Sequence, residues 1–228
     1  MDILRGHLGF TDIRIPDEIF DHDLQYDQAV ALIRSLKQVA EDRNLTFGVK
    51  LSNTLAMANH RDVLPGDEMY MSGRALYPIT MALFHTLTEE FAGDRPTGSE
   101  HVLDVSYSAG ADALNVTSIL SCGALPVTAV SDLLKPGGYS RFLQYLENLE
   151  RDMERLGVAS LDELARDRLT NLDREAWQAL ELERYKKSYH PYDLPKVESG
   201  LDLFDCIDAP CREQCAVRQD VPEYAWLI

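Results

Sequence analysis

Short runs of β-branched residues alternate with segments of helical periodicity from residue 10 to about residue 156. This alternation is typical of βα units around a parallel sheet, so it predicts an α/β fold. Four strands are expected, at residues 11–15, 46–51, 102–107 and 126–130. Each is followed by a segment with a helical pattern, and these segments begin near residues 27, 72, 112 and 139.

Four βα units amount to half of an eight-stranded TIM-type (β/α)8 barrel. A half barrel leaves two strand edges open, and open edges must be paired or covered. We therefore expect either self-association through the open edges or a parent polypeptide whose remainder covers them.

The composition changes after Gly157. Ser160 and Glu163 form a capping-box pattern, which predicts the start of two charged helices that end near residue 187. The expected domains are a partial TIM-type barrel domain at 1–156, a helical connector and linker at 157–200, and a cysteine-bearing segment at 201–228.

The chain carries 38 acidic and 22 basic residues, for a formal net charge of −16. This charge repels a phosphate backbone, so no nucleic-acid partner is expected. The longest uncharged stretch, residues 113–131, contains Asn115 and Pro126, which favours a buried helix and strand over a membrane span. The first residues lack the basic and apolar regions of a signal peptide. We therefore expect a cytoplasmic protein with no membrane partner.

Three of the four cysteines, Cys206, Cys211 and Cys215, lie within ten residues of one another. Thiolates at this spacing can ligate iron–sulfur clusters, and zinc or non-ligand cysteines are the alternatives. The 13 residues after Cys215 contain no Cys or His, so the remaining ligands are expected outside this chain. Cys122 stands alone in an apolar stretch and is expected to be buried.

The string that begins at Cys206 and continues through Gln219-Asp220-Val221-Pro222 resembles the start of a helical two-cluster ferredoxin domain. Such domains occur in the small subunit of glutamate synthase and in dihydropyrimidine dehydrogenase. The resemblance implies that the first two cysteines ligate one [4Fe–4S] cluster and the third ligates its neighbour. Leu203 and Ala216 depart from the pattern, since relatives have an additional cysteine and a common proline there.

Longer strings in the barrel-like part resemble the selenate reductase-like family. They are Phe47–Thr54, Leu64–Pro78, Ser106–Asp112 and Leu133–Tyr139. In that family a dihydropyrimidine-dehydrogenase-like barrel precedes an iron–sulfur and pyridine-nucleotide module. The resemblance implies that this chain holds the C-terminal half of the barrel, a helical connector and the start of an all-α ferredoxin-like domain. FAD and NAD(P)H would bind only in parts of the parent outside this chain.

The implied function is that of a component of an iron–sulfur flavin oxidoreductase, which relays electrons between a pyridine nucleotide and an unidentified acceptor. Its partners would be the remainder of the parent polypeptide or other redox subunits. The substrate-protonating cysteine of dihydropyrimidine dehydrogenase has no counterpart here, so no catalytic residue is identified. The alternative is a non-catalytic barrel scaffold that docks an electron-transfer module in a multi-subunit enzyme.

The resemblance also implies an FMN site at the carboxyl ends of the barrel strands. The phosphate would lie on backbone N–H groups of Ser108, Ala109 and Gly110 in one loop, and of Thr128 and Ala129 in another. Ala109 stands where relatives usually have glycine. The alternative for the first loop is a tight turn packed under a helix.

Three residues near the second expected strand could contact the flavin ring. Lys50, Asn53 and Thr54 offer an ammonium, an amide and a hydroxyl to its pyrimidine edge. The alternative for Lys50 is an ion pair with Asp67 or Glu68.

Two further residues have both a functional and an ordinary interpretation. His22 could be a general acid or a solvated loop residue. Arg74 could bind an anion, or it could be a surface or ion-paired arginine.

Overall fold

The computed structural model describes residues 2–21, 23–61, 65–92 and 102–189. The helices in these ranges are α1 (Tyr26–Asp42), α2 (Leu76–Ala92), α3 (Val116–Ser121), α4 (Arg141–Leu156), α5 (Leu161–Leu164) and α6 (Arg168–Glu181). The strands are β1 (Gly48–Leu51), β2 (Leu55–Ala58), β3 (Glu68–Met71), β4 (Asp104–Ser108) and β5 (Ala124–Thr128). Short helical turns lie at η1 (Ile3–His7), η2 (Asp17–Phe20), η3 (Gly73–Ala75), η4 (Gly138–Ser140) and η5 (Glu183–Tyr185).

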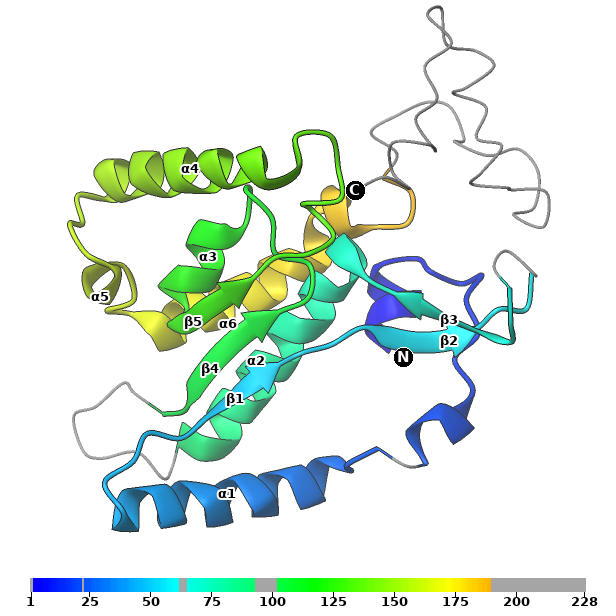
Figure 1. Ribbon diagram of the computed structural model, residues 1–228, viewed down its shortest axis with the longest axis horizontal. Helices are drawn as coiled ribbons and strands as arrows, with labels where there is room; N and C mark the ends of the chain where they lie inside the picture. The colour runs from blue at the N-terminus through cyan, green and yellow to red at the C-terminus, as the bar shows by residue number, and fades with distance from the viewer. Residues whose placement is uncertain (1, 22, 62–64, 93–101, 190–228) are drawn as a thin grey trace, which may run out of the picture.

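A parallel sheet in the order β1-β4-β5 forms the centre of the molecule (Figure 1). Its strands are those predicted at 46–51, 102–107 and 126–130, so the α/β class is confirmed. A second sheet, the antiparallel pair β2 and β3, occupies a segment that the sequence pattern left as a loop.

The prediction of a strand at residues 11–15 is wrong, because the structure has no strand there. The parallel sheet of the described residues therefore has three strands instead of four. Ile13 and Ile15 are buried, as the alternating pattern required, but the backbone around them is irregular. The Arg14 carbonyl accepts a hydrogen bond from Ala58 N at 2.8 Å, so this segment packs beside β2 without a strand ladder. Alternating apolar residues indicate that one side of a segment is buried. An irregular segment can bury one side as a strand does, so the pattern does not establish a strand.

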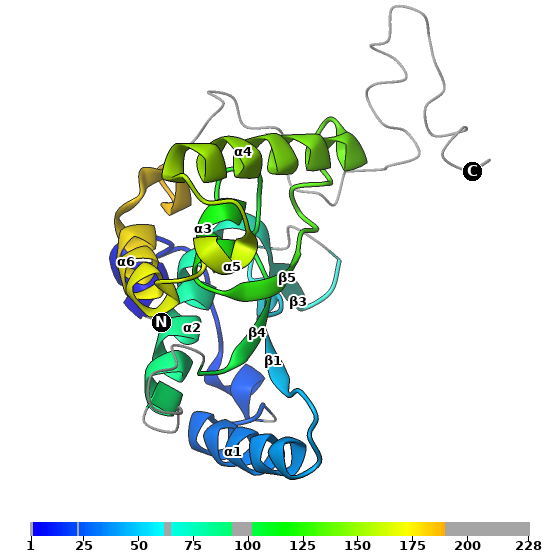
Figure 2. The same cartoon turned by 90° about the vertical axis from the view of Figure 1, so that its left-hand side faces the viewer.

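Helices α2 and α6 cover one face of the parallel sheet (Figure 2). Phe84 and Phe91 of α2, Leu172 of α6 and Val105 of β4 belong to the main buried cluster. Burial of each large apolar side chain contributes roughly 1.5–3 kcal/mol. Tyr185 also joins this core, so the described part of the segment after Gly157 packs on the sheet's helices.

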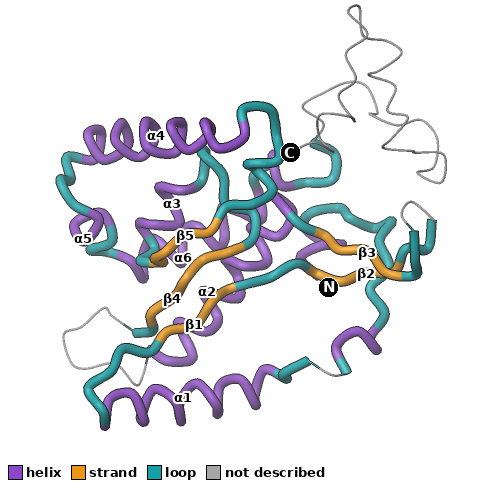
Figure 3. The backbone as a smooth tube through the Cα atoms, viewed as in Figure 1, coloured by secondary structure: helices purple, strands orange, loops and turns teal. Residues whose placement is uncertain are grey.

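The other face of the sheet carries no helix in the described part of the chain (Figure 3). Lys50 lies opposite Ser106 in the register of β1 and β4, and Ser108 lies opposite Thr128 in that of β4 and β5. Since side chains alternate along a strand, these four residues share the face opposite buried Tyr107. These four positions of the open face are therefore polar.

A smaller core joins α3, α4 and α5 and fixes the position of α4. It contains Val116, Leu120, Tyr145 and Leu164. Among the described helices, none is both long enough and apolar enough to span a membrane.

Candidate functional site

The predicted cofactor residues gather along the carboxyl edge of the parallel sheet. Ser52 N, just after β1, donates to the Ser108 carbonyl at 2.8 Å, and Ser108 pairs with Thr128. The loops that carry Asn53, Gly110 and Ala129 therefore begin side by side. Carboxyl edges of parallel strands are the usual location of sites in barrel folds.

Lys50 lies within β1 and not in the loop after it. Its side chain is exposed on the open face of the sheet. Among the ion pairs of the described residues, none joins Lys50 to Asp67 or Glu68. Its predicted role toward a flavin ring stays a prediction.

The turn after β4 is held in a conformation that favours glycine at two consecutive positions. Ala109 has φ 94° and Gly110 has φ 77°. A Cβ on Gly110 would lie 2.8 Å from the Gly73 carbonyl oxygen and 2.9 Å from Tyr77 N. The turn is thus pressed against the start of α2, and only glycine permits this approach.

Asn115 stabilises the same turn through two side-chain hydrogen bonds. Its side-chain oxygen accepts from Asp112 N at 2.8 Å, and its amide donates to the Gly110 carbonyl at 2.9 Å. Because Asn115 is buried, these bonds are shielded from water.

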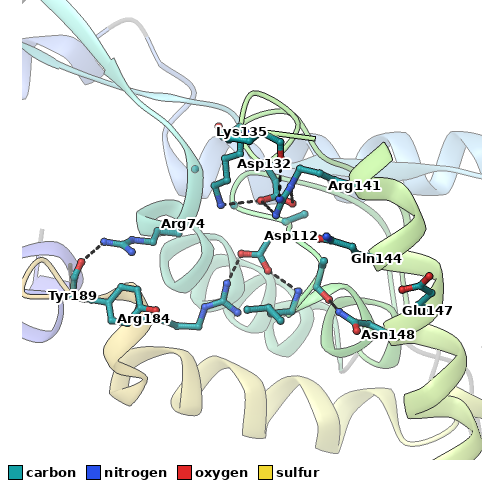
Figure 4. Close-up of a pocket in the computed structure, with 17 residues that line it drawn as sticks. Arg74, Asp112, Asp132, Lys135, Arg141, Gln144, Glu147, Asn148, Arg184 and Tyr189 are labelled. Carbon is teal, nitrogen blue, oxygen red and sulfur yellow. Dashed lines mark hydrogen bonds and ion pairs between the residues drawn. The ribbon is translucent and has the colours of Figure 1, made fainter. Parts of the chain in front are cut away.

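A cavity of about 750 Å³ opens beside this turn (Figure 4). Gly73, Gly110 and Ser131 line the end nearest the strands, and Gln144 and Glu147 of α4 line the opposite wall. The volume lies within the range of small-molecule and cofactor sites. Of the eight predicted cofactor residues, Gly110 lines it, and the other seven lie outside its lining.

Asp132, in the loop after β5, is a lining residue of the cavity with several hydrogen-bond partners. Its carboxylate accepts hydrogen bonds from Lys135 at 2.8 Å, from Arg141 at 3.0 and 3.1 Å, and from the Tyr145 hydroxyl at 3.1 Å. Burial by itself would raise the pKa of Asp132, but the hydrogen bonds from Lys135 and Arg141 outweigh burial and hold that pKa below its ordinary value. Asp132 is therefore a charged anchor between the loop after β5 and α4.

Asp112 forms a second ion pair, with Arg184 of η5. The carboxylate also accepts a hydrogen bond from Leu114 N at 2.9 Å. This contact brings a residue from beyond α6 to the loop after β4.

Arg74 lies on η3, beside the strand end of the cavity. It donates to the Tyr189 carbonyl at 2.7 Å, and its guanidinium lies 4.8 Å from the centre of the Tyr189 ring. Burial lowers the pKa of Arg74, and the charge of nearby Arg184 acts in the same direction. No carboxylate among the described residues forms an ion pair with Arg74, so its ion-paired alternative is not supported.

The cavity therefore combines four cationic side chains with three carboxylates, in a chain whose net charge is strongly negative. Such a surplus suits an anionic ligand. Of these charged residues, only Arg74 was a candidate from the sequence. Asp112 lies in the loop after β4, and Asp132 and Lys135 lie in the loop after β5, and that position was the available cue. Arg184 offered none, because only folding brings η5 to the cavity.

Some predicted sites fall outside the described residues. These are Cys206, Cys211, Cys215 and His22. In the part of the chain that the structure does describe, no group of three or more His, Cys, Asp and Glu side chains could hold a metal ion. Cys122 is buried, as expected.

Comparisons with known proteins identify the family. No solved structure matches the chain significantly. Two proteins named "Putative oxidoreductase YgfK", from Escherichia coli K12 and from Escherichia coli O157:H7, are each 40% identical over 220 residues. The alignment covers 96% of this chain and 20% of each relative, so the chain spans about a fifth of their length. The model of the oxidoreductase YgfK N-terminal TIM-barrel domain matches residues 1–187, and the chain belongs to this family.

Proposed function

We propose that this chain is the FMN-binding part of a barrel within an iron–sulfur flavin oxidoreductase, which relays electrons between a pyridine nucleotide and an unidentified acceptor. One observation carries the proposal: the loops that follow β4 and β5 line a 750 Å³ cavity with a surplus of positive charge. The names of the relatives support the oxidoreductase class.

The residues present fit an FMN site. Ala109 and Gly110 both have a positive φ, the conformation expected of a glycine-containing loop whose backbone lies close to a ligand. Ala109 adopts this conformation although it carries a Cβ. The departure at Ala109 therefore does not remove the turn. When bound, FMN would supply one- and two-electron redox chemistry.

The chain's own residues would bind and orient the cofactor. The Asn53 side-chain oxygen accepts from Thr54 N at 2.9 Å, so its amide nitrogen is left to donate to a ring carbonyl. Lys50, on the open face, would place a positive charge near the edge of the ring. The loops after β4 and β5, with the cavity between them, would hold the phosphate end.

We also propose that the rest of the barrel belongs to the parent protein. Three observations support this: β1 and β5 each pair on one side only within the described sheet, one face of that sheet lacks helices, and parallel sheets are normally covered on both faces. Self-association through these edges is the competing arrangement. Cys206, Cys211 and Cys215 would supply part of the ligand sets of two [4Fe–4S] clusters.

Anaerobic purification of the parent protein, followed by absorption spectroscopy with iron and flavin analysis, tests this function. We expect FMN and iron together, and loss of FMN but not of iron or FAD in an Asn53→Leu variant of the parent. The control is Gln38→Leu, which changes an exposed amide side chain on α1 that bonds to Asp42 of the same helix. Iron without FMN in the unmodified parent would refute the flavin barrel and favour the scaffold alternative.

A further inference from the structure

Two arginines approach the cavity from elements that are 110 residues apart in the sequence. Arg74 belongs to η3 and Arg184 to η5, and these two turns contact each other. Figure 4 places both side chains on the side of the cavity opposite α4. The pair is therefore a product of tertiary structure.

Among the described residues, only one of the two guanidinium groups has a carboxylate partner. Asp112 pairs with Arg184, whereas Arg74 contacts the carbonyl and the ring of Tyr189 and no acidic side chain among the described residues. Like charges at a partly buried site repel each other more strongly than in water. An anion between them would offset this repulsion.

The charges of the cavity favour an anion at the arginines. The lining holds four cations and three carboxylates, which leaves a surplus of one positive charge. Glu147 lies across the cavity from the arginines (Figure 4), and among the described residues Asp112 is the carboxylate that pairs with either of them. A phosphomonoester carries a charge of roughly −1.5 to −2 at neutral pH, so it would offset this surplus.

Donor geometry and space also suit a phosphate group. Each guanidinium has five N–H groups in a planar fork that matches the oxygens of a phosphate. Gly73 and Gly110 line the same end of the cavity and have no side chains to obstruct a ligand.

We propose that Arg74 and Arg184 bind the phosphate group of a phosphomonoester at the strand end of the cavity. That this group is the phosphate of FMN rests on the function proposed above. The arginine pair itself could equally hold free phosphate or another phosphomonoester, because all three share the same oxygens and charge.

Flavin fluorescence titrations with FMN and with riboflavin, which lacks the phosphate, test the proposal on the 228-residue chain. Inorganic phosphate serves as competitor and as a separate ligand in thermal melts. Arg74→Gln is the main variant, because no carboxylate among the described residues loses a partner with it. Arg155→Gln is the matched control, since Arg155 is an exposed arginine of α4 that pairs with Asp152. If Arg74→Gln fails to fold by circular dichroism, Arg74→Lys replaces it, because it keeps the charge but loses the planar fork.

The expected result is tighter binding of FMN than of riboflavin, and competition by phosphate. Arg74→Gln should weaken FMN binding by about 10- to 100-fold, the usual loss for a hydrogen bond to a charged group, and leave riboflavin binding unchanged. Arg155→Gln should match the unmodified chain for both ligands.

Three other outcomes separate this inference from the proposed function. Equal affinity for FMN and riboflavin, unaffected by Arg74→Gln, would overturn the arginine site and leave the flavin site standing. Thermal stabilisation by phosphate that Arg74→Gln abolishes, with no flavin binding, would support the arginine site and refute FMN as its ligand. Absence of binding by FMN, riboflavin and phosphate alike would overturn the arginine site, whereas the flavin site is decided by the FMN analysis of the parent protein.

Discussion

Gly110→Ala should destabilise the protein more than an ordinary glycine-to-alanine change does. Gly110 has φ 77°, and an added Cβ would lie 2.8 Å from the Gly73 carbonyl oxygen and 2.9 Å from Tyr77 N. Both neighbours are backbone atoms, which cannot move aside as a flexible side chain does. The substitution therefore forces the loop after β4 away from the start of α2.

The magnitude has two parts. A non-glycine residue in the left-handed region costs roughly 1–2 kcal/mol. Forced overlap in a packed region typically costs a further 1–3 kcal/mol, so the free energy of unfolding should fall by about 2–5 kcal/mol. A typical domain has only about 5–15 kcal/mol of stability in total.

Gly157→Ala separates the two parts. Gly157 ends α4 with φ 69°, and nothing lies within 4 Å of its added Cβ. The backbone term is then nearly the same, and the overlap term is absent. We expect Gly157→Ala to cost about 1 kcal/mol, within the usual range for a glycine in this conformation.

Urea unfolding followed by far-UV circular dichroism measures both variants. The slope of the free energy against urea should not change, since the surface exposed on unfolding is the same. Equal losses for Gly110→Ala and Gly157→Ala would refute the close approach of the loop to α2. Such a result would also remove the close packing of this turn as a reason to place a ligand beside it.

Three further substitutions test other parts of the site. Ala109→Gly should stabilise the protein by about 0.5–1 kcal/mol in urea unfolding, because relief of the left-handed strain exceeds the entropy cost of glycine; a loss of stability would show that Ala109 is unstrained. Tyr77→Phe should leave stability unchanged or raise it by about 1 kcal/mol, because the buried Tyr77 hydroxyl has no hydrogen-bond partner among the described residues; a loss of about 2 kcal/mol would reveal a partner. Asp132→Asn should lower the urea midpoint at pH 7 and flatten its decline below about pH 4. Folding lowers the pKa of Asp132, so its contribution to stability is fully present above the pKa of the unfolded state. That contribution is lost as the pH falls through the pKa of the folded state. Parallel pH profiles of the urea midpoint for the two proteins would contradict this role.

Local pattern was sufficient for much of the fold. The strands at 46–51, 102–107 and 126–130 were predicted because each is a short β-branched or apolar run bounded by turn residues, and such runs form buried parallel strands. The pattern failed at residues 11–15, where Ile13 and Ile15 are buried without a strand. Burial periodicity does not specify which backbone hydrogen bonds form, and β2 with β3 was missed for the same reason.

The candidate site, like the fold, has features that could be predicted from the sequence and others that could not. Small and polar residues after the parallel strands could be predicted from the sequence, since strand ends can be recognised locally and parallel strands share one carboxyl edge. Which charged residues meet at that edge depends on the packing of distant segments. Arg184 reaches Asp112 across 72 positions because α6 packs against α2, and neither residue carries a local mark of that contact. Side-chain burial and ion pairing depend on such long-range packing, whereas strand and helix patterns depend mainly on neighbours along the chain.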